Sequence, residues 1–297
     1  MKSKAWTEKF MQGVFFVAAC ASVLAVALIC IFLFANGIPA MREIGFIKFI
    51  TGEIWRPNSE QLGILPMIVG SLYVTAGAII FGVPIGILTS VFMAMYCPKQ
   101  IYKPLKAATE LLAGIPSVIY GFFGLVVVVP LIRQFGTALH KARIVENPGN
   151  GNSILTASLI LGMMILPTII GTTESAMRAV PSHYYEGSLA LGATKERSIF
   201  RVIIPAAKSG VITGIVLGIG RAIGETMAVI MIVGNQARLT NSILDGIRTL
   251  TGNIVIEMGY ATGLHREALI ATGVVLFVFI LIINLCVALL KRGTDHE

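Results

Sequence analysis

An arginine and a glutamate, Arg221 and Glu225, stand four residues apart in an otherwise uncharged stretch from Ser209 to Val233. On a helix this spacing brings the two side chains to one face, where they can form an ion pair. A guanidinium also matches two oxygens of an oxyanion with its planar donors. The pattern favours an anion path at these two residues, with a buried structural salt bridge as the alternative.

Glycines lie on the same predicted helix face as the charged pair, at Gly210, Gly214 and Gly218. A stripe of small residues in an apolar helix lets another backbone approach closely, or leaves room for a ligand. Both readings stay open from the sequence.

A second segment of interest runs from Pro181 to Pro205 and mixes charged, polar and apolar residues. Ser182 is placed to cap a helix, and Gly192 is placed to end it in the left-handed conformation. A second helix, 195–202, is expected to stop before Pro205. The sequence therefore predicts a helix–glycine–helix unit. A single helix that starts at Pro205 is expected to join this unit to Arg221.

The composition excludes an ordinary soluble domain. Of 297 residues, 56% are hydrophobic and 13% are charged, whereas soluble domains carry about 25% charged residues. A spanning helix needs about 20 apolar residues, and the uncharged runs predict six: 13–35, 67–96, 111–132, 153–173, 209–233 and 268–290. Because these runs do not alternate between polar and apolar residues, the predicted fold is an all-α bundle of transmembrane helices.

The distribution of lysine and arginine predicts the orientation. These residues are more frequent in the N-terminal segment 1–12, in the loops after the second and fourth spans, and in the tail 291–297. The excess places both termini in the cytoplasm. The segment 36–66 is then external, the core covers 67–290, and 234–267 is an external segment that is interfacial or re-entrant. The first apolar run is too long for a signal peptide and is expected to remain as a span.

Several kinds of chemistry have no support in the sequence. It contains no Gly-x-x-x-x-Gly-Lys-Ser/Thr loop, so ATP is expected to bind to another chain. The four histidines and four cysteines show no metal-ligand spacing. We therefore expect a protein that is not an enzyme and that carries no cofactor or metal.

The segment from Glu186 to Pro205 resembles the EAA loop of ABC importer permeases with the MetI-like fold. Glu186, Gly187 and Ser188 stand at the Glu-Ala-Ala triplet, Gly192 follows at the family spacing, and Pro205 closes the pattern. In that family the loop is a coupling helix seated in a groove of the ATPase subunit. The resemblance implies that these five residues couple the chain to an ATPase.

Further runs resemble phosphate-specific ABC permeases of the PstC type: 220–229 (GRAIGETMAV), 110–122 (ELLAGIPSVIYGF), and the Trp55-Arg-Pro and 63–66 (GILP) segments. The resemblance implies a phosphate importer of the bacterial inner membrane, with Arg221 and Glu225 in the phosphate path. It also implies a PstA-like second permease subunit, two PstB-like ATPase subunits and a periplasmic or lipid-anchored PstS-like phosphate-binding protein.

Two other functions remain open from the residues alone. The chemistry of Arg221 suits molybdate or sulfate as well as phosphate. A stand-alone channel is the second alternative, although a lone channel has no use for a docking loop.

Overall fold

The structure, a computed structural model, describes the backbone of residues 2–294 and the side chains of residues 8–285. The N-terminal segment expected at 1–12 and the tail expected at 291–297 therefore fall partly outside the described residues. Cys286 falls outside the described side chains, whereas Cys20, Cys30 and Cys97 are free thiols.

The described chain is helical apart from one small hairpin and its loops. The long helices are α1 (Lys2–Ile44), α3 (Leu65–Val91), α4 (Lys99–Gly114), α6 (Val129–Lys141), α7 (Ile154–Arg178), α11 (Lys208–Gly224) and α14 (Gly263–Thr294). The short ones are α2 (Phe46–Thr51), α5 (Ser117–Phe123), α8 (Ser182–Ala190), α9 (Lys195–Ser198), α10 (Ile204–Ala206), α12 (Met227–Ile232) and α13 (Leu250–Glu257). Three π-helical turns (Phe92–Tyr96, Gly124–Val128 and Ile199–Ile203) and a 3-10 turn (Pro57–Ser59) complete the helices. Strands β1 (Trp55–Arg56) and β2 (Gln61–Leu62) pair antiparallel.

Five helical stretches are long and apolar enough to cross a membrane: Glu8–Ile44, Leu65–Tyr96, Ser117–Lys141, Ile154–Arg178 and Gly263–Leu285. A sixth is added if Lys195–Ala206 and Lys208–Gly224, which meet at 71°, count as one span. The predicted all-α bundle of transmembrane helices is confirmed.

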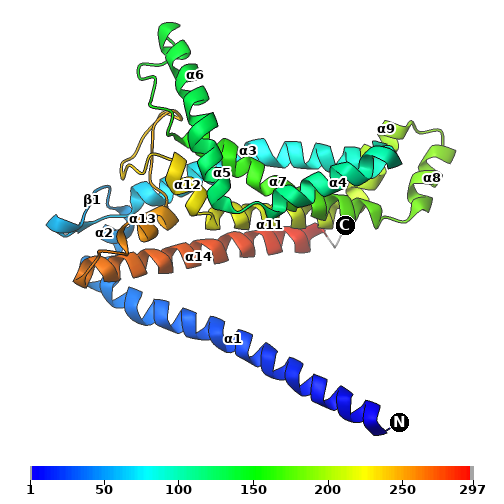
Figure 1. The fold of residues 1–297 in the computed structure, drawn as a ribbon, viewed down its shortest axis with the longest axis horizontal. Helices are drawn as coiled ribbons and strands as arrows, with labels where there is room; N and C mark the ends of the chain where they lie inside the picture. The colour runs from blue at the N-terminus through cyan, green and yellow to red at the C-terminus, as the bar shows by residue number, and fades with distance from the viewer. Residues whose placement is uncertain (1, 295–297) are drawn as a thin grey trace.

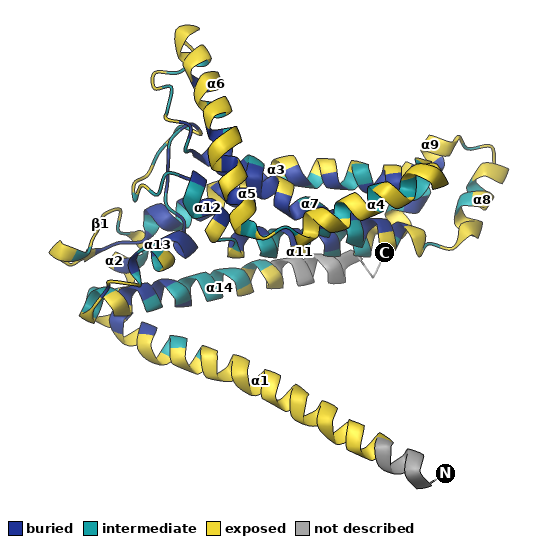
Figure 2. Ribbon diagram, viewed as in Figure 1, coloured by how far each residue is buried: buried dark blue, intermediate teal, exposed yellow. Residues whose placement is uncertain are grey.

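Helix α7 is the central element. It packs along α3 and α11 (Figure 1). In the most apolar 18-residue stretch of α7, 61% of the residues are buried, compared with 0% in the corresponding stretch of α1 (Figure 2). Glycines on α3 allow the close approach: a Cβ on Gly82 would lie 2.9 Å from the carbonyl oxygen of Gly162. Small residues at such crossings supply the packing that holds spanning helices together.

The contact between α3 and α7 gives a first testable expectation. In Gly77→Ala the new Cβ would overlap the hydroxyl of Ser158 and lie 2.6 Å from its Cβ, so rotating that side chain cannot relieve the clash. We expect a loss of about 1–3 kcal/mol of stability, measured as a lower melting temperature in detergent. Gly171→Ala, where no atom of the described chain lies within 4 Å, should melt no lower than the wild type, and equal melting of both variants would contradict this packing.

The third predicted span, 111–132, is wrong at its start. Residues 111–114 belong to α4, and the backbone leaves the helix at Ile115 and Pro116 before α5 begins at Ser117. The reason is Pro116, because a proline disfavours the helical conformation in the residue before it. The spanning stretch therefore runs from Ser117 to Lys141.

The two ends of the bundle differ in structure. The beginning of α1 and the end of α14 lie on the side that carries α8 and α9, at the right of Figure 1. The opposite end carries the hairpin, α2 and α13. Helix α13 sits deep in this end, because Leu250 and Asn253 are fully buried and Leu250 N donates a hydrogen bond of 2.9 Å to Ser71 Oγ.

Candidate functional site

The loop between α7 and α11 forms a helical projection. Helix α8 has no buried residue among those described. It ends at Ala190, two residues before Gly192, whose φ is +83°. Gly192 N donates to the carbonyl of Leu189 at 2.9 Å and Ala193 N to that of Ser188 at 3.2 Å. The predicted left-handed glycine cap is confirmed, and it turns the chain toward α9.

Two details of this loop differ from the sequence prediction. Ser182 is the first helical residue, while Pro181 occupies the N-cap position and no side chain caps the helix. The second helix does not stop before Pro205: α9 continues through a π-helical turn into α10, which contains this proline. The wider π turn makes room for the proline ring, which in a regular helix would meet the carbonyl four residues earlier.

Polar and aromatic contacts hold the projection in place. The hydroxyls of Ser188 and Ser198 lie 2.9 Å apart and join α8 to α9. The ammonium of Lys195 lies 4.4 Å from the ring centre of Tyr96, at the end of the second span. Leu191 is 90% exposed at the tip. A preformed helical unit thus presents an apolar tip away from the bundle.

The fifth predicted span, 209–233, is not one helix. Helix α11 ends at Gly224, Glu225 adopts an extended conformation (φ −71°, ψ 131°), and α12 begins at Met227. The carboxylate oxygen Oε1 of Glu225 accepts hydrogen bonds from the backbone amides of Thr226 (3.1 Å) and Ala228 (3.3 Å). Glu225 therefore caps the start of α12.

The predicted pair between Arg221 and Glu225 is wrong in the described structure. No ion pair joins them there, because the extended backbone at Glu225 removes the one-turn spacing that a continuous helix would supply. Within the described side chains Arg221 has neither an ion-pair nor a hydrogen-bond partner; it is partly exposed and interacts electrostatically with Tyr120 of α5. The positive charge of Arg221 is thus not neutralised by any described side chain.

The glycine stripe of α11 packs against α7. A Cβ on Gly214 would lie 3.1 Å from Thr173 Oγ1, and one on Gly218 would lie 3.1 Å from Ile169. Of the two readings open from the sequence, the close approach of another backbone is therefore the one observed.

Sequence reasoning missed a buried charge cluster at the end of the bundle that carries α8. Glu174 of α7 is 1% exposed and accepts hydrogen bonds from Tyr102 Oη (2.6 Å), Lys106 Nζ (2.8 Å) and Arg178 Nε (2.6 Å). The glutamate and Arg178 stand four residues apart at the end of an apolar run, and this spacing was the available signal.

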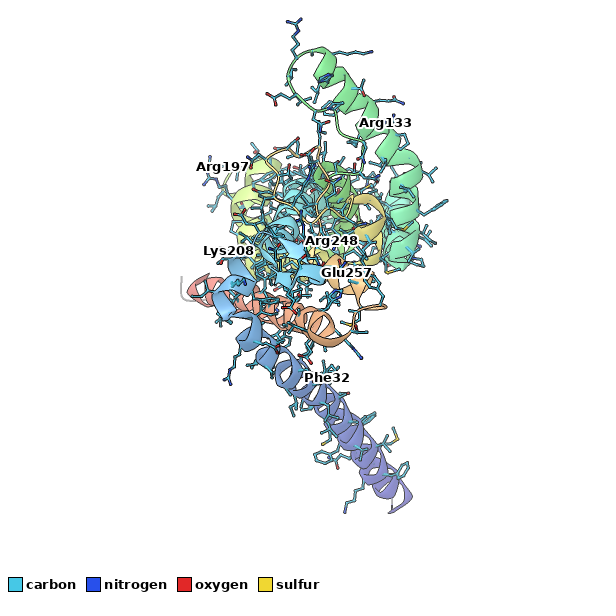
Figure 3. The ribbon with its side chains drawn as sticks, turned by 90° about the vertical axis from the view of Figure 1, so that its left-hand side faces the viewer. Phe32, Arg133, Arg197, Lys208, Arg248 and Glu257 are labelled. Atoms are coloured by element: carbon cyan, nitrogen blue, oxygen red, sulfur yellow. The ribbon has the colours of Figure 1, made fainter. Side chains whose placement is uncertain are left out.

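A second cluster, also missed, lies at the opposite end. Glu257 of α13 accepts a hydrogen bond from Arg248 (Figure 3). It also accepts one from Trp55 Nε1 (2.8 Å) and lies 2.8 Å from His265 Nε2. Glu257 and His265 also line one side of a cavity of about 700 Å³, whose other lining residues include Arg56 and Glu60. The cluster joins the hairpin, α13 and the start of α14.

Solved structures share this architecture. A MetNI methionine ABC transporter chain superposes with a TM-score of 0.60 at 20% identity, covering 81% of this chain and 99% of that one. A bacterial transporter that imports alginate gives 0.62 at 15% identity, covering 94% and 96%. At these identities the likeness concerns the fold, which is the predicted MetI-like one.

Residues 82–296 match the family described as binding-protein-dependent transport system inner membrane component. The chain belongs to this family. The permease is thus a multi-pass membrane subunit of an ABC importer, a class that works with an ATPase and a substrate-binding protein.

Curated relatives agree with this family. "Probable ABC transporter permease protein YqgH" of Bacillus subtilis is 39% identical and covers 92% of this permease and 89% of its own length. The phosphate transport system permease proteins PstC of Mesorhizobium japonicum (37%, covering 86% and 81%) and Haemophilus influenzae (32%, covering 93% and 90%) are also similar. The predicted resemblance to PstC-type permeases is confirmed.

Proposed function

We propose that this permease moves inorganic phosphate into the cytoplasm, with Arg221 and Glu225 on the path. The observation that carries the proposal is Arg221, a permanent charge in the last turn of the apolar helix α11 that does not form the expected ion pair with Glu225. A mid-membrane arginine costs at least about 2.5–3.5 kcal/mol unless it meets a counter-charge or a polar cavity. A transient phosphate supplies that counter-charge, and the relatives named for phosphate transport support this choice of anion.

The break at Glu225 supports the same reading. A spanning helix that is interrupted leaves backbone groups without helical partners, which membrane proteins tolerate where the backbone lines a cavity. Thr251 Oγ1 of α13 donates to the carbonyl of Glu225 at 3.3 Å, so the external segment contacts the break. The carboxylate of Glu225 places a negative charge beside the path, which weakens anion binding enough for release.

The proposed coupling site is the projection formed by α8 and α9. Glu186 and Gly187 are exposed, and Ser188 and Gly192 fix the shape of the projection. An exposed leucine beside a rigid helix suits a groove on a protein partner. Pro205 then lies where the loop rejoins the membrane, two residues before the bend into α11 at Ala207.

The proposed assembly contains four kinds of chain. A PstA-like permease would face this one across the path, two PstB-like ATPases would bind the coupling sites, and a PstS-like binding protein would deliver phosphate at the external end. In this arrangement segments 1–12 and 291–297 are cytoplasmic and segment 36–66 is external. The protein sits in the bacterial inner membrane.

The test is phosphate uptake by proteoliposomes that contain the permease, its partner permease, the ATPase and the binding protein. We expect uptake of radiolabelled phosphate that requires ATP and that persists in excess sulfate or molybdate. If molybdate or sulfate at equal concentration inhibits the uptake of phosphate, the proposed substrate would be that oxyanion instead of phosphate. Uptake by the permease without ATPase or ATP would support a channel instead.

A further inference from the structure

Helix α4 is held to the bundle in an unusual way. None of its 16 residues is buried within the described chain, so little apolar packing fastens it. Its hydrogen bonds to the buried carboxylate of Glu174, from Tyr102 and Lys106, supply the attachment instead. A buried carboxylate that loses such partners is left uncompensated, so these contacts hold α4 to α7 strongly.

The same carboxylate is joined to the base of α8. Arg178, the last residue of α7, donates to Glu174 and also to the carbonyl of Met93 at 2.8 Å, and its guanidinium lies 4.4 Å from the ring centre of Tyr102. Helix α8 begins at Ser182, four residues later. A displacement of α8 therefore reaches the Glu174 cluster within one short turn of chain.

Helix α4 is tied across the Pro116 break to the next element. The hydroxyl of Tyr120, in α5, donates to the carbonyl of Leu112 in α4 at 2.9 Å. Gly121 of α5 lies against α12, where a Cβ would sit 2.8 Å from the Cα of Ala228. Helices α5 and α12 thus meet backbone to backbone, and these two contacts connect α4 to α12.

The contacts end at the proposed anion path. The amide of Ala228 donates to the carboxylate of Glu225, so the residue that meets Gly121 also holds the glutamate. The direct route along the chain is not one straight helix, because α10 and α11 meet at a bend of 71° at Ala207. The expectation from sequence of one helix from Pro205 to Arg221 is therefore wrong.

We propose that Glu174 is a positioning residue that transmits movement of α8 through α4 and α5 to α12 and Glu225. It does not touch the anion. It keeps α4 attached to α7, so that a shift of the coupling projection moves the break at Glu225 instead of being lost in the loop. The inference rests on the proposed function, since it names the contacts through which ATPase-driven movement would reach the proposed phosphate path.

The test compares ATP hydrolysed with phosphate transported in the reconstituted complex. The variants are Glu174→Gln, which removes the charge, and Tyr102→Phe, which removes one hydrogen bond and keeps the ring under Arg178. We expect both to hydrolyse ATP while transporting less, which raises the ratio of ATP to phosphate about fivefold or more in Glu174→Gln. Lys106→Gln should also raise the ratio.

The controls lie on the same helix. Lys99→Gln and Lys103→Gln make the same substitution as Lys106→Gln at exposed lysines of α4, and both should keep the wild-type ratio. A purely structural cluster would lower ATP hydrolysis and uptake together at an unchanged ratio, and that result would overturn the proposal. If Glu174→Gln does not assemble, Tyr102→Phe decides by the same ratio.

A double variant tests whether the contacts form one route. Because Tyr102 and Gly121 act in series, Tyr102→Phe combined with Gly121→Ala should raise the ratio no further than the worse single change. Independent multiplication of the two effects would overturn the route. Either outcome leaves the proposed substrate untouched, since wild-type phosphate uptake and its competition by sulfate or molybdate are measured separately.

Discussion

Replacing Arg221 by glutamine is expected to abolish ATP-driven phosphate uptake while the complex still assembles. Glutamine keeps a polar side chain of similar reach but loses the charge and the planar fork of donors. Two charge-assisted hydrogen bonds contribute about 1.5–3 kcal/mol each. Their loss corresponds to a fall in uptake of at least about a hundredfold, measured in proteoliposomes with the partner subunits.

Assembly should survive this change for a physical reason. Arg221 has no ion-pair partner within the described structure, so its removal leaves no uncompensated charge behind. A glutamine in a spanning helix also costs less to insert than an arginine. We expect equal amounts of wild-type and Arg221→Gln permease to copurify with the ATPase.

Two further variants sharpen the result. Arg221→Lys keeps the charge and loses the fork, so it should transport at an intermediate rate. Arg266→Gln removes an exposed arginine at the external end of the bundle and should transport like the wild type. Wild-type uptake by Arg221→Gln would show that Arg221 does not contribute to the phosphate path. The proposed role of the break at Glu225 would then also lose its support.

The spanning helices could be predicted from sequence because they depend on a local property. Hydropathy averaged over about 20 residues needs no knowledge of neighbours, and the second and fourth spans follow α3 and α7 closely. The glycine cap at Gly192 was equally local, because the left-handed conformation is a property of one residue. Such features carry over directly from residue types.

The breaks at Pro116 and Glu225 are harder to predict. Pro116 gives a local warning, yet prolines inside α3 and α7, such as Pro84 and Pro167, leave those helices continuous. At Glu225 the extended backbone is stabilised by Thr251, which comes from α13 and is 26 residues away in sequence. Helical spacing alone therefore predicted an ion pair that the tertiary structure replaces with a helix cap.

The Glu174 cluster shows the same limit more strongly. Its members come from α4 and α7, and Tyr102 and Glu174 are 72 residues apart in the chain. In the sequence Glu174 falls just after the predicted fourth span, where a charge is unremarkable. Only the packing of α4 on α7 makes it a buried group, so burial, not residue type, is the information that the sequence lacks.

Two matched glycine substitutions in the coupling loop are expected to have opposite effects. Gly192 and Gly187 both have open space around the position of a new Cβ, but only Gly192 has a positive φ, of +83°. Alanine in the left-handed region costs about 1–2 kcal/mol. Gly192→Ala should therefore lower the ratio of native to non-native loop conformations by about 5–30-fold.

The consequence is measured as ATPase binding and uptake. The cap sets the direction of the chain between α8 and α9 and thus the position of Leu191, so Gly192→Ala should weaken copurification of the ATPase and lower uptake by roughly tenfold. Gly187→Ala replaces a glycine inside α8 and stabilises that helix by about 0.5–1 kcal/mol; it should keep full binding. Because the two changes add the same methyl group to the same loop, equal losses would mean that bulk at the ATPase surface matters, and that the shape set by Gly192 does not.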